Sequence, residues 1–247
     1  VQINPDEIVI TSGGMEALNL SLQAVTQPGD LVAIESPTFY GALQAIERLK
    51  LKAVEIPTHP RTGVDLNVLA QSLQQLPIKA CWFMTSFQNP LGFCLSNAEK
   101  QKVAQLAAKY QCHVIEDDIY AECSFSAARP LPIQYWDQQG YVVYCGSVSK
   151  SLSPSYRVGW FCIPPRLKHL HAKLIIQNIS VNTPLQLGLA DLIYSRAYRQ
   201  HLSQLRPKLM KQVEQYRQFI VQAFAGVAVR INHPQGSYAL WLQFPEH

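Results

Sequence analysis

The chain has 247 residues, of which 48% are hydrophobic and 15% are charged. This composition fits one large globular domain, or one domain with part of a second, and excludes a disordered chain. The net charge is only +4 and no basic run exceeds two residues, so this segment itself is not expected to bind nucleic acid. No apolar run reaches about 18 residues, so no membrane-spanning helix is expected.

The N-terminal residues and the cysteines indicate the compartment. No basic stretch followed by an apolar one opens the chain, so no secretory signal peptide is expected. The chain starts with Val1, which indicates a fragment or a processed piece. The six cysteines form no Cys-x-x-Cys pair. Buried free thiols in the reducing cytoplasm are the simplest interpretation, with disulfides or a zinc site as the alternative.

Short apolar runs alternate with helical patterns over most of the chain. Most of the runs are continuously apolar, which suits strands buried on both faces of a sheet. Strands are predicted at 7–11, 31–35, 51–56, 79–84, 113–118, 141–147 and 158–163. Helices are predicted at 15–25, 40–49, 66–75, 97–110 and 166–177. Ser96 and Glu99 form a capping-box pattern at the start of the fourth helix.

The pattern changes after Pro184. Helices are predicted at 185–195 and 198–225, the second interrupted only by Pro207. Gly226 ends this helical stretch, and short strands are predicted after it at 227–231 and 238–244.

The sequence therefore predicts a three-layer α/β/α fold around a mostly parallel seven-stranded sheet. The start of a small C-terminal α+β domain follows it. The expected division is a large domain at 1–196, a connecting helix at 197–225 and the beginning of the small domain at 226–247.

The predicted strand at 141–147 runs into the small-residue segment Gly-Ser-Val-Ser-Lys at 146–150, which ends at Lys150. Arg157 comes seven residues later. A lysine among small residues at a strand end can lose solvent, which lowers its pKa and makes the amine a Schiff-base nucleophile. The Ser147 hydroxyl and the Arg157 guanidinium suit a phosphate group. A surface turn with ordinary charges is the alternative.

Three acidic residues, Glu116, Asp117 and Asp118, end the predicted strand at 113–118. Ligands of open α/β sheets bind beyond the carboxyl ends of the strands, and a carboxylate there can keep a pyridinium nitrogen protonated. Helix capping or a metal-binding acidic cluster are the alternatives. Adjacent strand residues point to opposite faces, which argues against a shared metal ion.

Other strand ends carry further candidate ligand groups. The Ser-Gly-Gly-Met turn at 12–15 leads into a helix, and free backbone N–H groups at a helix start bind anions. Phe39 or Tyr40 could stack on a flat ring, with core packing as the alternative. Asn89 precedes Pro90; it marks a turn, and its amide could also donate to a ring oxygen.

These features are weak singly but specific in this order. The stretches ITSGGMEALNLSLQAV, KACWFMTSFQNPLGF, VIEDDIYAE and SVSKSLSPSYRVGW resemble the fold type I pyridoxal-phosphate enzymes of the class I/II aminotransferase family. The resemblance is greatest to the aminotransferase-like domain of MocR-type regulators in the GntR superfamily, and it covers essentially the whole chain. It implies that the cofactor is pyridoxal 5′-phosphate (PLP).

The resemblance implies a role for each candidate residue. Lys150 would form a Schiff base with the cofactor and then move protons at the substrate α-carbon. Asp117 would pair with the pyridine nitrogen. Asn89 and Tyr120 would hydrogen-bond the ring hydroxyl oxygen, and Phe39 would stack on the ring. The residues expected to hold the phosphate are Gly13, Gly14, Met15, Ser147, Ser149 and Arg157.

The resemblance implies an amino acid as substrate or effector and a cytoplasmic homodimer. In one interpretation the chain is the effector-binding and dimerisation domain of a transcriptional regulator, whose DNA contact is made by an N-terminal winged helix-turn-helix domain outside this sequence. In the other it belongs to a stand-alone amino-acid aminotransferase, or to another fold type I enzyme such as a C–S lyase or decarboxylase. The family's arginine for the substrate carboxylate is expected beyond the end of the chain, since Arg230 comes too early.

Overall fold

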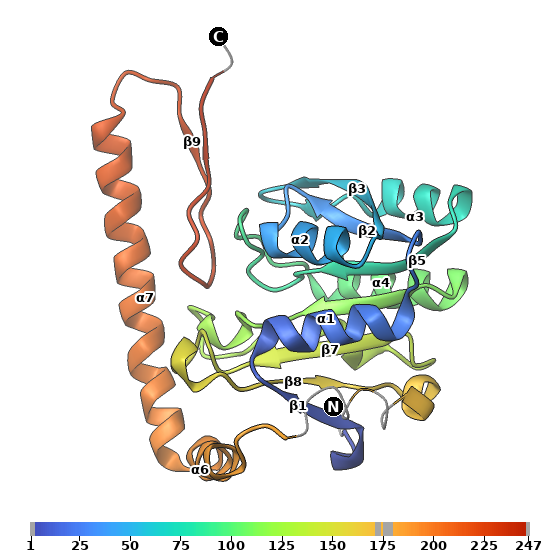
Figure 1. Ribbon diagram of the computed structural model, residues 1–247. Helices are drawn as coiled ribbons and strands as arrows, with labels where there is room; N and C mark the ends of the chain where they lie inside the picture. The colour runs from blue at the N-terminus through green and yellow to red at the C-terminus, as the bar shows by residue number, and fades with distance from the viewer. Residues whose placement is uncertain (1–2, 171–173, 175–179, 246–247) are drawn as a thin grey trace.

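The computed structural model describes residues 3–170, 174 and 180–245. Figure 1 shows a twisted sheet flanked by helices, with one long helix and a C-terminal hairpin to one side. The strands of the sheet are β1 (Ile8–Thr11), β2 (Leu31–Ser36), β3 (Lys52–His59), β4 (Gly63–Val64), β5 (Ile78–Phe83), β6 (His113–Asp117), β7 (Val142–Ser147) and β8 (Gly159–Cys162).

The sheet has eight strands in the order β1-β8-β7-β6-β5-β2-β3-β4. Strands β3, β2, β5, β6 and β7 run parallel to one another. Strand β8 is antiparallel to β7 and β1, and β4 is antiparallel to β3. The central parallel strands therefore end at one edge of the sheet, which is where ligands bind in open α/β folds.

All seven predicted strands are present, and the mostly parallel α/β fold is confirmed. The sheet nevertheless has eight strands rather than seven. The additional strand, β4, has only two residues. Two residues are too few to show the alternation by which a strand is recognised in a sequence.

Helices cover both faces of the sheet. Helices α1 (Gly14–Val25) and α2 (Tyr40–Arg48) pack on one face, where they meet alternate residues such as Val32 and Ile34. Helices α3 (Leu66–Gln75) and α4 (Asn97–Tyr110) pack on the other face, against residues such as Ala33. The predicted capping box at the start of α4 is confirmed, because Ser96 and Glu99 each bond the other's backbone N–H.

Helices α6 (Thr183–Tyr194) and α7 (Arg196–Ala223) follow the sheet. The predicted interruption at Pro207 is wrong, because α7 continues through it. Tertiary contacts hold the helix on either side of the proline. Arg206 donates to Glu122 O and Ala127 O, both at 3.0 Å, and Val213 is buried.

The predicted helix at 166–177 begins as a 3-10 helix, Pro165–Leu170, and most of its remaining length lies outside the described residues. The two C-terminal strands are shorter than predicted. They are β9 (Arg230–Ile231) and β10 (Leu242–Gln243), which pair antiparallel at the base of a long hairpin.

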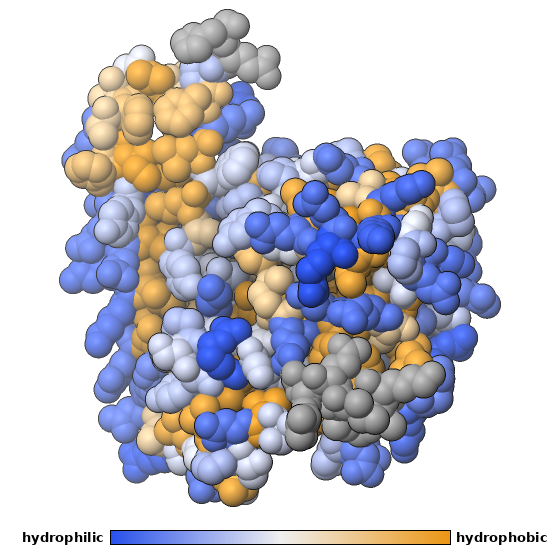
Figure 2. Space-filling view, viewed as in Figure 1, coloured by the Kyte–Doolittle hydropathy of each residue, from blue (hydrophilic) through white to orange (hydrophobic). Residues whose placement is uncertain are grey.

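Figure 2 shows apolar side chains running along α7 towards this hairpin. Exposed apolar side chains of α7 include Met210, Phe219 and Val221, and Phe244 near the C-terminus is also exposed. None of the helices in the described part of the chain combines the length and apolarity that a membrane span requires.

The packing of α1 on the sheet is expected to dominate stability. Leu22 is fully buried in the cluster between α1 and the sheet. Leu22→Ala should lower the free energy of unfolding by about 2–5 kcal/mol, because the sheet cannot collapse into the space. Leu76→Ala, at a side chain 41% exposed beside α3, is the matched control and should cost about 1 kcal/mol or less. Denaturant unfolding measures both; equal losses would contradict this account of the core.

Candidate cofactor site

The predicted site residues gather at the edge where the parallel strands end. Asp117 is the last residue of β6 and Ser147 the last of β7. Gly14 is the first residue of α1, and a methyl group added to it would lie 3.3 Å from Ser147 Cβ. Lys150 follows β7, and its Nζ lies 5.3 Å from the centroid of the Tyr120 ring. Residues from distant parts of the sequence therefore share one site.

Asp117 is a fully buried carboxylate without a hydrogen bond. It shares a strand face with Ile115, which packs in the cluster below α1. Neither carboxylate oxygen has a hydrogen-bond partner within the described residues. Burial raises the pKa of Asp117 to about 7. The Trp82 indole and the Ile119 backbone N–H, which lie near the carboxylate but do not reach hydrogen-bond geometry, and the charge of Lys150 lower the pKa by less. A buried carboxylate without a donor is costly, so this position suits a ligand that brings a donor or a positive charge.

The neighbours of Asp117 point to the opposite face of the sheet. Glu116 accepts hydrogen bonds from Thr85 Oγ1 at 2.9 Å and from Ile133 N at 2.8 Å. Asp118 pairs with Arg129 at 2.7 Å. The three consecutive acids therefore do not form one acidic cluster, and Asp117 alone faces the site.

A buried cation accompanies these two acids. Lys100 is fully buried in α4 and donates to Ser86 Oγ at 2.9 Å and to Leu131 O at 2.8 Å. Its charge lowers the pKa of Glu116 and of Asp118, although burial raises both pKa values overall. A network of buried charges and hydrogen bonds thus lies beside the strand end that carries Asp117.

An aromatic cluster lies beside Lys150. The Tyr120 ring packs with Met84 and Phe87, and Phe39 packs against them. Tyr40 is 68% exposed and contacts Phe39 from outside, with ring centroids 4.8 Å apart. The structure thus places Phe39, rather than Tyr40, next to Tyr120. Burial raises the pKa of Tyr120 well above its ordinary value, so the phenol keeps its proton and can donate a hydrogen bond.

The start of α1 forms a cradle with two other segments. Gly13 has a φ of 101°, and an added methyl group would lie 2.5 Å from Arg157 Nη2. Arg157 donates to Ser12 O at 2.8 Å. Ser147 Oγ and Ser149 Oγ are 2.8 Å apart. No side chain caps the start of α1.

The cradle therefore offers several donors for one anion: the first backbone N–H groups of α1, two hydroxyls and a guanidinium. Met15, the second residue of α1, is 36% exposed, so any contribution it makes to the anion comes from its backbone. The donor set and the buried carboxylate fit the two ends of PLP, an anionic phosphate and a basic ring nitrogen.

Sequence reasoning missed the residues that hold the Asn89 turn. Gln88 is fully buried and donates to Pro37 O at 3.0 Å and to Glu35 Oε2 at 3.3 Å. It also accepts from Leu91 N at 2.7 Å. Gln88 therefore ties the Asn89 turn to the segment that leads to Phe39. Glu35 was visible in the sequence as an acidic residue within the apolar run of β2. A buried acid needs hydrogen-bond donors, so its position could have indicated that polar partners such as Gln88 lie nearby.

A profile of the family Aminotransferase class I and II matches residues 1–247. The chain therefore belongs to this family. It is 44% identical over 246 residues to the uncharacterized HTH-type transcriptional regulator YdcR of Escherichia coli strain K12, covering 100% of this chain and 52% of that protein. The chain thus spans about half the length of this curated relative.

Solved structures agree on the fold. A kynurenine aminotransferase from Pyrococcus horikoshii, crystallised with PMP, superimposes with a TM-score of 0.88 at 27% identity, covering 99% of this chain and 62% of that one. The α-aminoadipate aminotransferase LysN from Thermus thermophilus, complexed with N-(5′-phosphopyridoxyl)-L-leucine, also gives 0.88, at 26% identity, covering 98% and 63%. This chain is therefore an aminotransferase-like domain of the PLP-dependent fold type I.

Asp117 should make the stability of the cofactor-free protein depend on pH. The folded carboxyl keeps its proton up to about pH 7, whereas the unfolded chain releases it near pH 4. The unfolded state binds fewer protons in this range, so the free energy of unfolding falls as pH rises from about 4 to 7. Asp117→Asn removes this loss and should stabilise the protein by about 2–3 kcal/mol more at pH 8 than at pH 5.

Denaturant unfolding of the cofactor-free protein at both pH values measures this difference. Glu47→Gln alters an exposed carboxylate on α2 and is the matched control, for which the change should be the same at both pH values. An Asp117→Asn effect that does not vary with pH would show that the buried carboxyl is not the titrating group.

Proposed function

We propose that this chain binds PLP through Lys150 and Asp117 and serves as the effector-binding domain of a transcriptional regulator. The single observation that carries the proposal is the buried Asp117 carboxylate without a hydrogen bond, which lies near enough to Lys150 for the lysine charge to lower its pKa. The donor-rich cradle at Gly13, Gly14 and Arg157 supports it. An amino acid is the proposed effector, because PLP enzymes and their relatives react with amines.

When bound, the cofactor supplies an aldehyde that condenses with amines and a ring that accepts electrons from a neighbouring carbanion. Lys150 provides the amine that holds the aldehyde and later moves a proton at the α-carbon of the amino acid. The Asp117 carboxylate holds the proton on the ring nitrogen, which preserves the ring as an electron acceptor. The Tyr120 phenol and the Asn89 amide donate to the ring oxygen, and Phe39 packs on the ring face.

The cradle fixes the other end of the cofactor. Gly14 and Met15 offer backbone N–H groups, and Gly13 lets Arg157 approach closely. Ser147 and Ser149 add hydroxyl groups beside the guanidinium. With both ends of the cofactor held in this way, Lys150 would be the amine available to its aldehyde, and such positioning favours the reaction.

The similarity to YdcR over the whole chain favours the regulator over the enzyme. In this proposal the DNA contact belongs to a winged helix-turn-helix domain outside the sequence, and the protein acts as a homodimer in the cytoplasm. A stand-alone amino-acid aminotransferase is the second candidate, favoured by the similarity to aminotransferase structures. Lys150 and Asp117 would serve both functions.

Lys150→Ala should abolish covalent cofactor binding. The intact wild-type protein should develop a visible absorption band with PLP that borohydride removes by fixing the cofactor to Lys150, because borohydride reduces the carbon–nitrogen double bond. The variant should show neither the band nor a modified peptide by mass spectrometry. Lys102→Ala, at an exposed lysine of α4, should behave like wild type. A wild-type protein without the band, or modification of another lysine, would refute the proposed function.

Turnover should separate the two candidate functions. In the PLP-loaded intact protein, each amino acid is tested for a shift of the visible band, release of the corresponding keto acid and a change in DNA affinity. A regulator should show the band shift and the changed affinity, with keto acid limited to one equivalent per site. Sustained keto-acid release in the presence of an amino acceptor would assign the chain to an aminotransferase instead.

A further inference from the structure

The C-terminal hairpin contacts segments next to the candidate site that lie more than 100 residues earlier in the sequence. At its base, Asn232 N donates to Trp241 O at 3.1 Å and Trp241 N donates to Asn232 Oδ1 at 2.9 Å. At its tip, Ser237 N donates to Cys123 O at 3.0 Å and Phe125 N donates to Gln235 O at 2.9 Å. The tip therefore pairs with the segment that follows Tyr120.

Asn232 joins this hairpin to the Asn89 turn. Its side-chain Nδ2 donates to Leu91 O at 2.8 Å and to Ala239 O at 3.3 Å. Gly92 permits this approach, because a methyl group there would lie 2.6 Å from Asn232 Nδ2. Asn232 O accepts from Arg217 Nε of α7 at 3.0 Å. The Asn232 carboxamide thus links the hairpin to the turn, and the Asn232 backbone carbonyl links both to α7.

The Asn89 turn is held at two points only a few residues apart. On the side of the large domain, the Gln88 side chain accepts from Leu91 N in the turn and donates to Pro37 O, just after β2. Outside it, Asn232 bonds to Leu91 O. Asn89 lies between Gln88 and Leu91 in the sequence. The contacts made by Gln88 and by Asn232 therefore both restrict the backbone that carries the Asn89 side chain.

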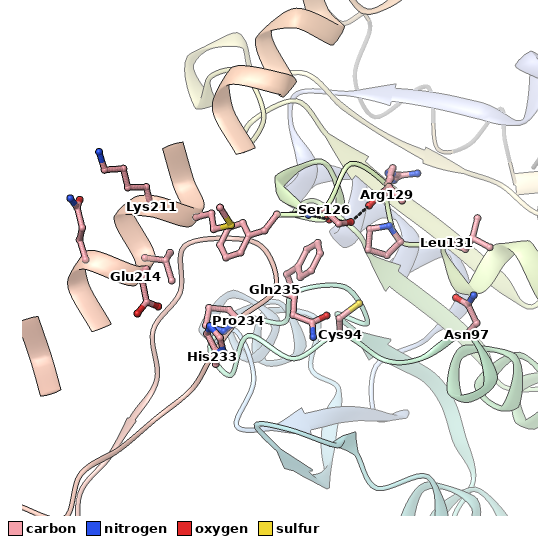
Figure 3. Close-up of a pocket in the computed structure, with 18 of the residues that line it drawn as sticks. Cys94, Asn97, Ser126, Arg129, Leu131, Lys211, Glu214, His233, Pro234 and Gln235 are labelled. Carbon is pink, nitrogen blue, oxygen red and sulfur yellow. Dashed lines mark hydrogen bonds between the residues drawn. The ribbon is translucent and has the colours of Figure 1, made fainter. Parts of the chain in front are cut away.

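The hairpin also makes apolar contacts with the large domain, because Trp241 packs against the core cluster that contains Leu91 and Phe93, and a methyl group on Gly236 would lie 2.6 Å from the Phe87 ring. A cleft of about 1070 Å³ separates α7 from the segment 124–131. Figure 3 shows Lys211 and Glu214 of α7 on one side of the cleft, Arg129 and Leu131 on the other, and Pro234 and Gln235 of the hairpin between them. The hydrogen bonds made by Asn232 and by the hairpin tip are the polar part of this connection.

We propose that Asn232 is a positioning residue, which orients the Asn89 side chain towards the cofactor ring by holding the turn from the C-terminal side. The hairpin also places Tyr238 against Tyr120, with ring centroids 5.6 Å apart. Both groups proposed to donate to the ring oxygen are thus held by one hairpin. This inference rests on the proposed PLP site.

Asn232→Asp tests the inference with little change in shape. The new carboxylate keeps the acceptor for Trp241 N, but it has no donor for Leu91 O or Ala239 O. Gln243→Glu makes the same chemical change at an exposed position of β10 in the same hairpin and is the matched control. Both variants are made in the intact protein.

The first measurement is hydrogen exchange of the cofactor-free protein. In Asn232→Asp, backbone amides at 88–93 should exchange roughly 3- to 30-fold faster than in wild type, because a buried hydrogen bond to the turn is lost. Gln243→Glu should leave their exchange unchanged. Unchanged exchange in Asn232→Asp would overturn the inference, and this readout does not depend on PLP binding.

The second measurement is the pH at which the visible band of the PLP-loaded protein titrates. Asn89→Ala should move it to higher pH, since a donor to the ring oxygen is lost, and Asn232→Asp should move it in the same direction by up to about one pH unit. The double variant should shift no further than Asn89→Ala alone, because Asn232 acts through Asn89. Additive shifts would overturn the positioning role.

The outcomes separate this inference from the proposed function. A wild-type protein that forms no band refutes PLP binding, and the exchange measurement alone then decides whether Asn232 holds the turn. A normal wild-type band with an unshifted Asn232→Asp titration refutes the inference alone. If Asn232→Asp does not fold, Asn232→Ser replaces it, because serine is too short to reach Leu91 O.

Discussion

The burial of Asp117 at the end of a central parallel strand is the constraint around which the site is arranged. Strand geometry sends Glu116 and Asp118 to the other face, where Glu116 accepts a hydrogen bond from Thr85 and one oxygen of Asp118 pairs with Arg129. Asp117 has no such partner among the described residues. A carboxylate in this state is unfavourable by itself, and in the proposed function a cationic ring nitrogen supplies the missing partner.

The sheet topology brings the other parts of the site to this carboxylate. Parallel strands end at one edge, so the loops after β2, β5, β6 and β7 converge there although they are far apart in the sequence. The antiparallel strand β8 contributes differently. Its first residue, Gly159, lies so close to Gly13 that an added methyl group would be 2.5 Å from the Gly13 carbonyl carbon. This close packing brings the Arg157 guanidinium to the start of α1.

Polar side chains outside the site hold these loops in place. Glu35 and Gln88 connect the loops after β2 and β5 from within the sheet, and Asn232 supports the second of them from the C-terminal hairpin. Each is buried and makes more than one hydrogen bond, so each loses more than one contact when replaced. The arrangement of the site thus depends on polar residues that have no proposed role toward the cofactor and are not part of the apolar core.

The sequence by itself determined the α/β class, the seven longer strands and the candidate residues at their ends, because periodicity, small-residue turns and strand-end polar groups are local signals. It did not determine β4 or the continuity of α7 through Pro207. It also did not reveal Gln88 and Asn232 as supports. These features depend on contacts between distant residues, and only the tertiary structure decides which polar groups are buried together and which find a partner.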